Sequence, residues 1–162
     1  MSVIRASGID AKCVLIGRGL DASNAELASE IEQLGLKENT LLLGLREDVN
    51  DILRVLDLHI LPSRSEALPN VVAESMLSGV PNIATDVGDS ADMIGETGWV
   101  VAPGDHGAIA RAIGQAHELW CEQSGFWRQR RTAARERIAR NYTLDRMVRA
   151  YEELWRKVAF NG

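Results

Sequence analysis

Five short apolar runs recur along the chain, and longer stretches with a helical repeat separate them. The runs lie at residues 13–16, 41–43, 58–61, 82–85 and 99–101. Apolar runs of this length are typical of strands that are buried on both faces of a sheet. The sequence therefore predicts five short strands in an α/β protein.

The stretches between the runs predict helices. Leu27, Ile31 and Leu34 repeat at steps of four and three and are followed by Gly35, a pattern typical of an amphipathic helix that ends at a glycine. Further helices are predicted over residues 48–56 and 69–78. Strands that alternate with helices favour a Rossmann-like, doubly wound parallel sheet with helices on both faces.

The last third of the chain predicts mainly helices. Residues 107–123 place apolar side chains on one face. Residues 144–158 repeat apolar positions at i, i+3, i+4 and i+7, and charged residues occupy the opposite face. This closing helix must pack against something apolar, and its own domain is one alternative for that surface.

The chain has 162 residues, of which 46% are hydrophobic and 25% are charged. These values fit one globular domain with a buried core and exclude a complete two-domain enzyme. Cys13 and Cys121 are far apart, which favours reduced thiols. No apolar stretch reaches the roughly 18–20 residues that cross a bilayer, and no signal-peptide pattern is present, so we expect a cytoplasmic protein.

The charges are distributed unevenly along the chain. Residues 1–122 carry 19 acidic and 8 basic residues, whereas residues 123–162 carry 4 acidic and 10 basic ones. We therefore predict an α/β domain over residues 1–124 and a basic helical segment over residues 125–162. Nucleic-acid binding is not expected, because the acidic domain would repel a polyphosphate.

An arginine-rich run lies in the basic segment. It contains Arg128, Arg130, Arg131, Arg135, Arg137 and Arg140. The favoured interpretation is a solvated helix face. The alternative is contact with an anionic membrane surface through the arginines beside Phe126 and Trp127.

The most informative stretch for chemistry runs from residue 62 to residue 88. Glu66 follows the predicted strand at 58–61, in a loop at its carboxyl end, where open α/β sheets bind their ligands. Glu74 lies eight positions later, inside the next predicted helix. Both carboxylates can accept hydrogen bonds from sugar hydroxyls.

A helix start lies between the two glutamates. Pro69 in the first turn leaves the backbone amides of Asn70, Val71 and Val72 without helical acceptors. Open amides at a helix N-terminus attract phosphate. An anion site flanked by two carboxylates describes a pocket for a nucleotide sugar.

Other interpretations of single residues stay open. Two glutamates at this spacing, taken alone, are more often solvated surface carboxylates. Gly17 and Gly19 can form a phosphate-binding turn or a plain turn after a strand. The position of His59 inside an apolar run indicates a hydrogen-bonded core residue more than a catalytic base. No metal site is proposed.

Glu66 and Glu74 have seven residues between them and are followed by SMLSGVPNIATDVG. This pattern closely resembles the signature of the retaining family 4 glycosyltransferases of the GT-B fold. The resemblance extends from VLIGRG near residue 14, through LLLGLREDV and LDLHILPSRSE, to YTLDRMVRAYEELW. It implies the C-terminal, donor-binding half of a GT-B fold. It also implies that a hexose moves from a nucleoside-diphosphate sugar to a lipid-linked or polysaccharide acceptor with retention.

The resemblance gives each matching residue a role. Glu66 would contact the donor sugar as a positioning and electrostatic residue, and Glu74 would contact the ribose hydroxyls. The remaining implied contacts are the amides at Leu68, Asn70 and Val71 for the diphosphate, the turn at Gly17 and Gly19, and the segment of Leu45 and Arg46 beside the nucleobase. The family requires no metal, so a nucleotide sugar is expected as substrate and no cofactor is expected.

The chain departs from the family pattern at several points. Asp89 stands where a second glycine usually follows DVG, and Ala67 replaces a glycine that often follows the loop glutamate. The family's first strand, with its Gly-Arg turn and nearby lysine, has no counterpart here, and neither has the acceptor-binding N-terminal domain. We therefore expect a fragment that lacks the first strand of its sheet, binds part of a donor and cannot complete transfer.

Two further expectations concern the C-terminal helices. The resemblance implies that the end of the closing helix crosses to the N-terminal domain. The alternative to a donor-binding fragment is a non-catalytic, Rossmann-like assembly module, with a homodimer as one form. In that module the basic and amphipathic helices would be the contact surface.

Overall fold

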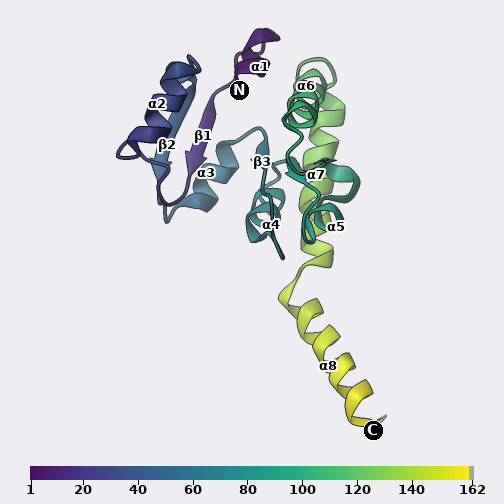
Figure 1. The fold of residues 1–162 in the computed structure, drawn as a ribbon. Helices are drawn as coiled ribbons and strands as arrows, with labels where there is room; N and C mark the ends of the chain where they lie inside the picture. Colours follow the sequence, from purple (N-terminus) through teal and green to yellow (C-terminus); the bar gives the residue numbers. More distant parts are fainter. Residues whose placement is uncertain (161–162) are drawn as a thin grey trace.

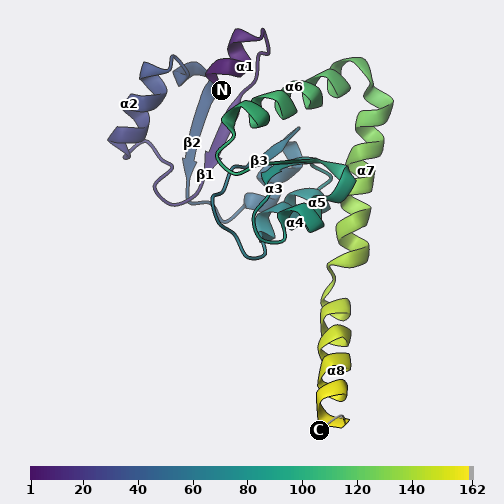
Figure 2. The ribbon, with the colours of Figure 1, turned by 45° about the vertical axis from the view of Figure 1, so that its right-hand side comes forward.

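The computed structural model describes residues 1–160 and shows an α/β body from which one helix extends (Figure 1 and Figure 2). The strands in this part of the chain are β1 Cys13–Ile16, β2 Thr40–Gly44, β3 His59–Leu61, β4 Asn82–Thr85 and β5 Trp99–Val101. The α-helices are α1 Ser2–Ala6, α2 Ala25–Gln33, α3 Val49–Val55, α4 Asn70–Leu77, α5 Ser90–Ile94, α6 His106–Glu122, α7 Ser124–Asn141 and α8 Leu144–Phe160. Short 3-10 helices lie at η1 Lys37–Asn39 and η2 Gly95–Thr97.

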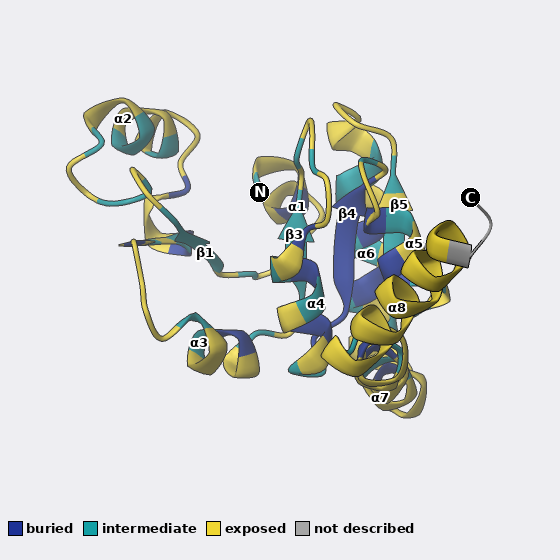
Figure 3. Cartoon of the chain, turned by 90° about the horizontal axis from the view of Figure 1, so that it is seen from below, coloured by how far each residue is buried: buried dark blue, intermediate teal, exposed yellow. Residues whose placement is uncertain are grey.

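The predicted strands are all present, and each strand pair is parallel, so the α/β class with parallel strands is confirmed. The strands form two groups, in agreement with the expectation of a doubly wound sheet without its first strand, which is central in that strand order. One part is β1 with β2, and the other is β3, β4 and β5 in that order. Within residues 1–160 no ladder joins β1 to β3, and Figure 3 shows the two strands well apart. The expectation that the strands are buried on both faces is correct for β4 and wrong for β2, where Leu41 and Leu43 are exposed.

The helices α2, α3, α4, α6 and α8 lie close to where the sequence repeats predict them. The structure adds α5, which the sequence pattern did not reveal. Its five residues are too few for a repeat of three to four positions to be recognised. Helix α1 lies at the start of the chain, where the family resemblance implies the end of a helix.

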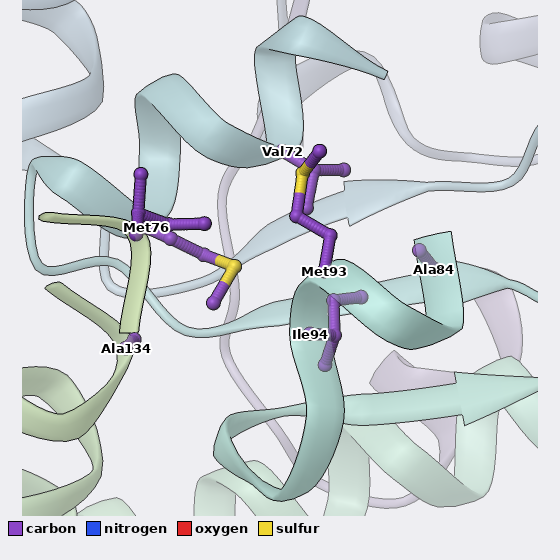
Figure 4. Close-up of a cluster of buried hydrophobic side chains, with 7 residues drawn as sticks. Val72, Met76, Ala84, Met93, Ile94 and Ala134 are labelled. Carbon is purple, nitrogen blue, oxygen red and sulfur yellow. The ribbon is translucent and has the colours of Figure 1, made fainter. Parts of the chain in front are cut away.

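The core lies where helices pack against the three-stranded sheet. Strand β4 is buried along its whole length. Apolar side chains from α4, α5 and α7 gather beside it (Figure 4). The cluster consists of Val72, Met76, Ala84, Met93, Ile94, Ala134 and Ile138. Helix α7, from the basic C-terminal segment, thus shares a core with the strands.

Polar side chains next to this core are hydrogen-bonded. Nδ1 of His59 lies 2.5 Å from Oδ1 of Asn82, and the Ser75 hydroxyl donates to the same oxygen at 2.9 Å. The Asn82 amide donates to the carbonyl of Val80 at 3.0 Å. Burial lowers the pKa of His59 and favours its neutral ring. The prediction that His59 is hydrogen-bonded is confirmed, and its side chain is half-buried at the edge of the core.

Arginines of α7 bind the carboxyl ends of two other helices. Nε of Arg131 donates to the carbonyl of Gly79, just after α4, at 2.8 Å. Nε of Arg137 donates to the carbonyl of Met93, in the last turn of α5, at 2.9 Å. Carbonyls at a helix C-terminus lack intrahelical donors and carry partial negative charge, so arginine stabilises them.

A third arginine of the run is also held by the body. Nη1 of Arg130 donates to the carbonyl of Glu96 at 3.1 Å, and its guanidinium carbon lies 4.6 Å from the centre of the Trp99 ring. The interpretation of the run as a solvated helix face is therefore wrong for Arg130, Arg131 and Arg137. It holds for the exposed residues Arg128, Arg135 and Arg140.

Helix α8 extends away from the body in both ribbon views (Figure 1 and Figure 2). Its large apolar side chains are exposed, namely Leu144, Met147, Val148, Tyr151, Leu154, Trp155 and Val158. The structure therefore does not realise the alternative in which this helix packs on its own domain. Among residues 1–160, no helix combines the length and apolar character needed to span a bilayer.

We predict that Arg131→Met and Arg137→Met each lower the free energy of unfolding by about 1–3 kcal/mol, because methionine has no N–H and each change leaves a carbonyl at a helix end without its donor. The control is Arg135→Met on the exposed face of the same helix, for which we expect a change within about 0.5 kcal/mol. Urea unfolding followed by circular dichroism measures all three variants. Similar losses in all three would contradict the capping role.

Candidate functional site

The candidate site is centred on the loop between β3 and α4, at the carboxyl end of β3. Glu66 lies in this loop with a half-buried side chain. The Ser63 hydroxyl donates a 2.7 Å hydrogen bond to Oε1 of Glu66. Glu74 lies in α4 and is exposed. The structure thus places both predicted glutamates in one loop-helix segment.

The start of α4 offers backbone amides, although fewer than the sequence predicted. The amide of Val72 donates to the carbonyl of Pro69 at 2.9 Å, because the chain closes a tight turn there. Val72 is therefore not free to bind a ligand. The amides of Asn70 and Val71 have no acceptor among the described residues, and the side chain of Leu68 is exposed.

The loop of Glu66 is attached to the neighbouring loop between β4 and α5. The Thr85 hydroxyl, at the end of β4, donates to the carbonyl of Ser63 at 2.6 Å. The amide of Asp89 donates to the carbonyl of Ala67 at 2.9 Å. Gly88 lies so close that an added Cβ would be 2.3 Å from the carbonyl oxygen of Ala67. Sequence reasoning missed the roles of Ser63 and Thr85. Ser63 precedes Glu66 by three residues, a spacing that could have suggested the contact, whereas Thr85 lies far from this loop in the sequence.

A glycine turn follows β1 on the other sheet. Gly17 and Gly19 have φ angles of 147° and 75°, in the region that favours glycine. The amide of Gly17 donates to the carbonyl of Gly44 at 2.9 Å, and the amide of Gly44 donates to the carbonyl of Leu20 at 2.8 Å. These bonds hold the turn beside the end of β2.

The predicted nucleobase segment follows directly after β2. The side chain of Leu45 is exposed. The guanidinium of Arg46 forms two hydrogen bonds with the Asp48 carboxylate, from Nε at 2.7 Å and from Nη2 at 2.6 Å. These bonds lower the pKa of Asp48 and raise that of Arg46. The Arg46 side chain is therefore engaged within its own turn.

The predicted site residues form two groups. Glu66, Leu68, Asn70, Val71 and Glu74 belong to the three-stranded unit, and Gly17, Gly19, Leu45 and Arg46 belong to the two-stranded unit. Both groups follow the carboxyl ends of parallel strands. A hollow of about 460 Å³ lies elsewhere, along α7, and is lined by Gly125, Arg128, Gln129, Thr132, Ala133 and Glu136. This hollow contains none of the predicted residues. The candidate site is therefore defined by its carboxylates and open amides, and not by a hollow in the surface.

The chain belongs to the glycosyl transferases group 1 family, whose model matches residues 1–118. It is 34% identical over 140 residues to the Vi polysaccharide biosynthesis protein VipC/TviE of Salmonella typhi, which covers 83% of this chain and 23% of that protein. It is 30% identical over 149 residues to N-acetyl-alpha-D-glucosaminyl L-malate synthase of Bacillus anthracis, which covers 91% of this chain and 38% of that protein. The chain thus spans less than half the length of these relatives.

Solved structures show the same fold. A glycosyltransferase from Rickettsia africae matches 99% of this chain and 43% of its own, with a TM-score of 0.84 and 21% identity. HepE of Anabaena, in complex with UDP, matches 85% of this chain and 40% of its own, with a TM-score of 0.68 and 24% identity. These structures confirm the prediction of a GT-B glycosyltransferase fold.

We predict that Gly88→Ala lowers the free energy of unfolding by about 3 kcal/mol, because a side chain would force the loop of Glu66 away from the loop after β4. The matched control is Gly104→Ala. Gly104 has a φ of +79° and nothing within 4 Å of an added Cβ, so it reports backbone strain alone. We expect the control to lose about 1 kcal/mol in urea unfolding. Equal losses would show that the two loops are not packed as described.

Proposed function

We propose that the chain is the donor-binding part of a hexosyltransferase that transfers its sugar with retention. The observation that carries this proposal is the half-buried carboxylate of Glu66, held by Ser63 in the loop that leads to the open start of α4. A carboxylate accepts hydrogen bonds from sugar hydroxyls, and open helix amides bind phosphate. A nucleoside-diphosphate sugar presents both kinds of group.

The segment of residues 66–74 supplies the main contacts in this proposal. The amides of Asn70 and Val71, with Leu68 beside them, bind the diphosphate, and the dipole of α4 stabilises its charge. Glu74 accepts hydrogen bonds from the ribose hydroxyls. Glu66 binds a sugar hydroxyl, and its negative charge stabilises the positive charge that develops at the anomeric carbon as the bond to the diphosphate breaks.

The two-stranded unit supplies the second wall of the donor site. The turn at Gly17 and Gly19 allows close approach of the donor, because glycine has no side chain. Leu45 contacts the nucleobase. Arg46 contributes its backbone, since its guanidinium is paired with Asp48. In this arrangement the nucleotide sugar is the substrate, and neither a metal nor a cofactor takes part.

We propose a lipid-linked or polysaccharide acceptor. Support comes from the relative named for Vi polysaccharide biosynthesis, and from the mannosyltransferase LpsB of Rhizobium meliloti, named for lipopolysaccharide core biosynthesis. The acceptor would be bound by an N-terminal domain outside these 162 residues. A lipid-linked acceptor also suits work at the inner face of a membrane, where the exposed Arg128, Arg135 and Arg140 are free to contact anionic lipid.

We predict that the isolated chain binds a nucleotide sugar weakly and does not transfer it. Isothermal titration with UDP-, GDP- and ADP-sugars identifies the base. Glu74→Ala should weaken the preferred nucleotide about tenfold, since a carboxylate that accepts ribose hydroxyls is lost.

The control for this titration is Glu118→Ala, an exposed glutamate of α6 far from the β3–α4 loop in sequence. Its affinity should equal that of the unchanged chain. Absence of binding for every nucleotide, or equal binding by the Glu74 variant, would refute the donor-binding proposal. Turnover by the purified chain would refute the prediction that transfer needs a further domain.

The second candidate is a non-catalytic assembly module, and the exposed apolar face of α8 favours it. In this candidate a second copy of the chain covers that face. We then expect a concentration-dependent dimer in size-exclusion chromatography with light scattering, and a monomer for the double variant Tyr151→Ser, Trp155→Ser. The control Glu153→Ser changes the opposite face and should leave the dimer intact. A monomer at all concentrations would exclude this candidate.

A further inference from the structure

We infer that Ser63 is a positioning residue, which fixes the Glu66 carboxylate in the orientation that receives the donor sugar. This inference rests on the proposed donor site and adds a residue to it. The direct observation is the 2.7 Å hydrogen bond from the Ser63 hydroxyl to Oε1 of Glu66. An ionised carboxylate only accepts hydrogen bonds, so the serine is the donor.

The bond makes the two carboxylate oxygens of Glu66 different. Oε1 accepts the hydroxyl proton of Ser63, which uses one of its two lone pairs. Oε2 has no hydrogen-bond partner within residues 1–160 and is therefore the more open of the two oxygens to a sugar hydroxyl. A glutamate side chain has several rotatable bonds, and ordering them on binding reduces affinity. Because Ser63 orders the side chain in advance, the sugar binds without that loss.

Ser63 is itself held from the buried strand β4. The hydroxyl of Thr85, a residue that is 1% exposed, donates to the carbonyl of Ser63 at 2.6 Å. This bond crosses from β4 to the loop after β3 and fixes the backbone at Ser63. The chain of contacts therefore runs from the core, through Thr85 and Ser63, to the carboxylate of Glu66.

The backbone of Glu66 is fixed from a second side. The Asp89 amide donates to the carbonyl of Ala67, and a Cβ added at Gly88 would lie 2.5 Å from the carbonyl oxygen of Glu66. The loop is thus held whether or not the Ser63 hydroxyl is present. Loss of that hydroxyl should free the Glu66 side chain and leave the loop backbone in place.

The test compares a nucleotide sugar with the matching nucleotide that lacks the sugar. The pairs are UDP-glucose with UDP, GDP-mannose with GDP, and ADP-glucose with ADP, titrated into the full 162-residue chain. We expect the unchanged chain to bind one sugar nucleotide more tightly than its nucleotide. Ser63→Ala should weaken the sugar nucleotide about fivefold, the value of one hydrogen bond, and leave the free nucleotide unchanged.

Two further variants separate positioning from a structural role. Ser63→Thr keeps the hydroxyl and should restore binding of the sugar nucleotide. Ser65→Ala changes an exposed serine of the same loop and should have no effect. Urea unfolding of each variant reports whether the fold is kept.

The outcomes are distinct. Equal weakening of nucleotide and nucleotide sugar by Ser63→Ala, or no weakening of either, overturns the positioning role while the donor site stands. If the unchanged chain binds both ligands equally, the sugar adds nothing to binding, and the positioning role fails together with the proposed contact between Glu66 and the sugar, while the nucleotide contacts stand. If the unchanged chain binds no nucleotide at all, the proposed function fails and this inference fails with it.

Discussion

The burial of β4 is the constraint on which the rest of the molecule depends. This strand pairs with β3 on one side and β5 on the other, and helices α4, α5 and α7 pack around it. Its first residue, Asn82, binds His59 and Ser75 inside the fold, and its last residue, Thr85, binds the loop of the candidate site. The first residue of β4 thus fixes polar side chains beside the core, and its last residue fixes the loop of the candidate site.

The sequence predicts the strands well because short runs rich in apolar and β-branched residues alternate with helical repeats, but it does not predict that β4, with Asn82 and Thr85 at its ends, is more buried than the more apolar β2. The runs alone do not show which strands pair. The family resemblance adds this, because a doubly wound sheet without its first, central strand is expected to divide between β1 and β3. The glutamates of the site were found because the segment of residues 66–74 carries a family spacing. Thr85 was not found, because its hydroxyl binds a backbone carbonyl 22 residues away in the sequence. Ser63 stands three residues before Glu66, but the bond between them depends on the conformation of the loop, which the sequence does not show.

The arginines of α7 show a related limit. Composition alone describes a solvated basic helix, since nothing in the run separates Arg131 from Arg135. Their difference arises from the packing of α7, whose Ala134 and Ile138 face the core and thereby direct Arg131 toward the end of α4. Helix α8 has the clearer amphipathic pattern of the two, yet its apolar face is exposed. A strong periodic pattern thus shows that a face needs a partner, and it does not show which partner.

The candidate site carries a net negative charge, which limits how it could attract a charged ligand. The segment of residues 62–89 carries Arg64 against the carboxylates of Glu66, Glu74, Asp86 and Asp89. A diphosphate brought to this segment is repelled by net negative charge, and a helix N-terminus offsets only about half an elementary charge. In the proposed donor site, attraction would therefore come from directed hydrogen bonds: those from the amides at the start of α4 to the diphosphate, and those from sugar and ribose hydroxyls to the two carboxylates. The strength of the second kind depends on how well each carboxylate is oriented. For the proposed recognition, the order that β4 imposes on the loop of Glu66 would therefore matter more than the charge of the domain.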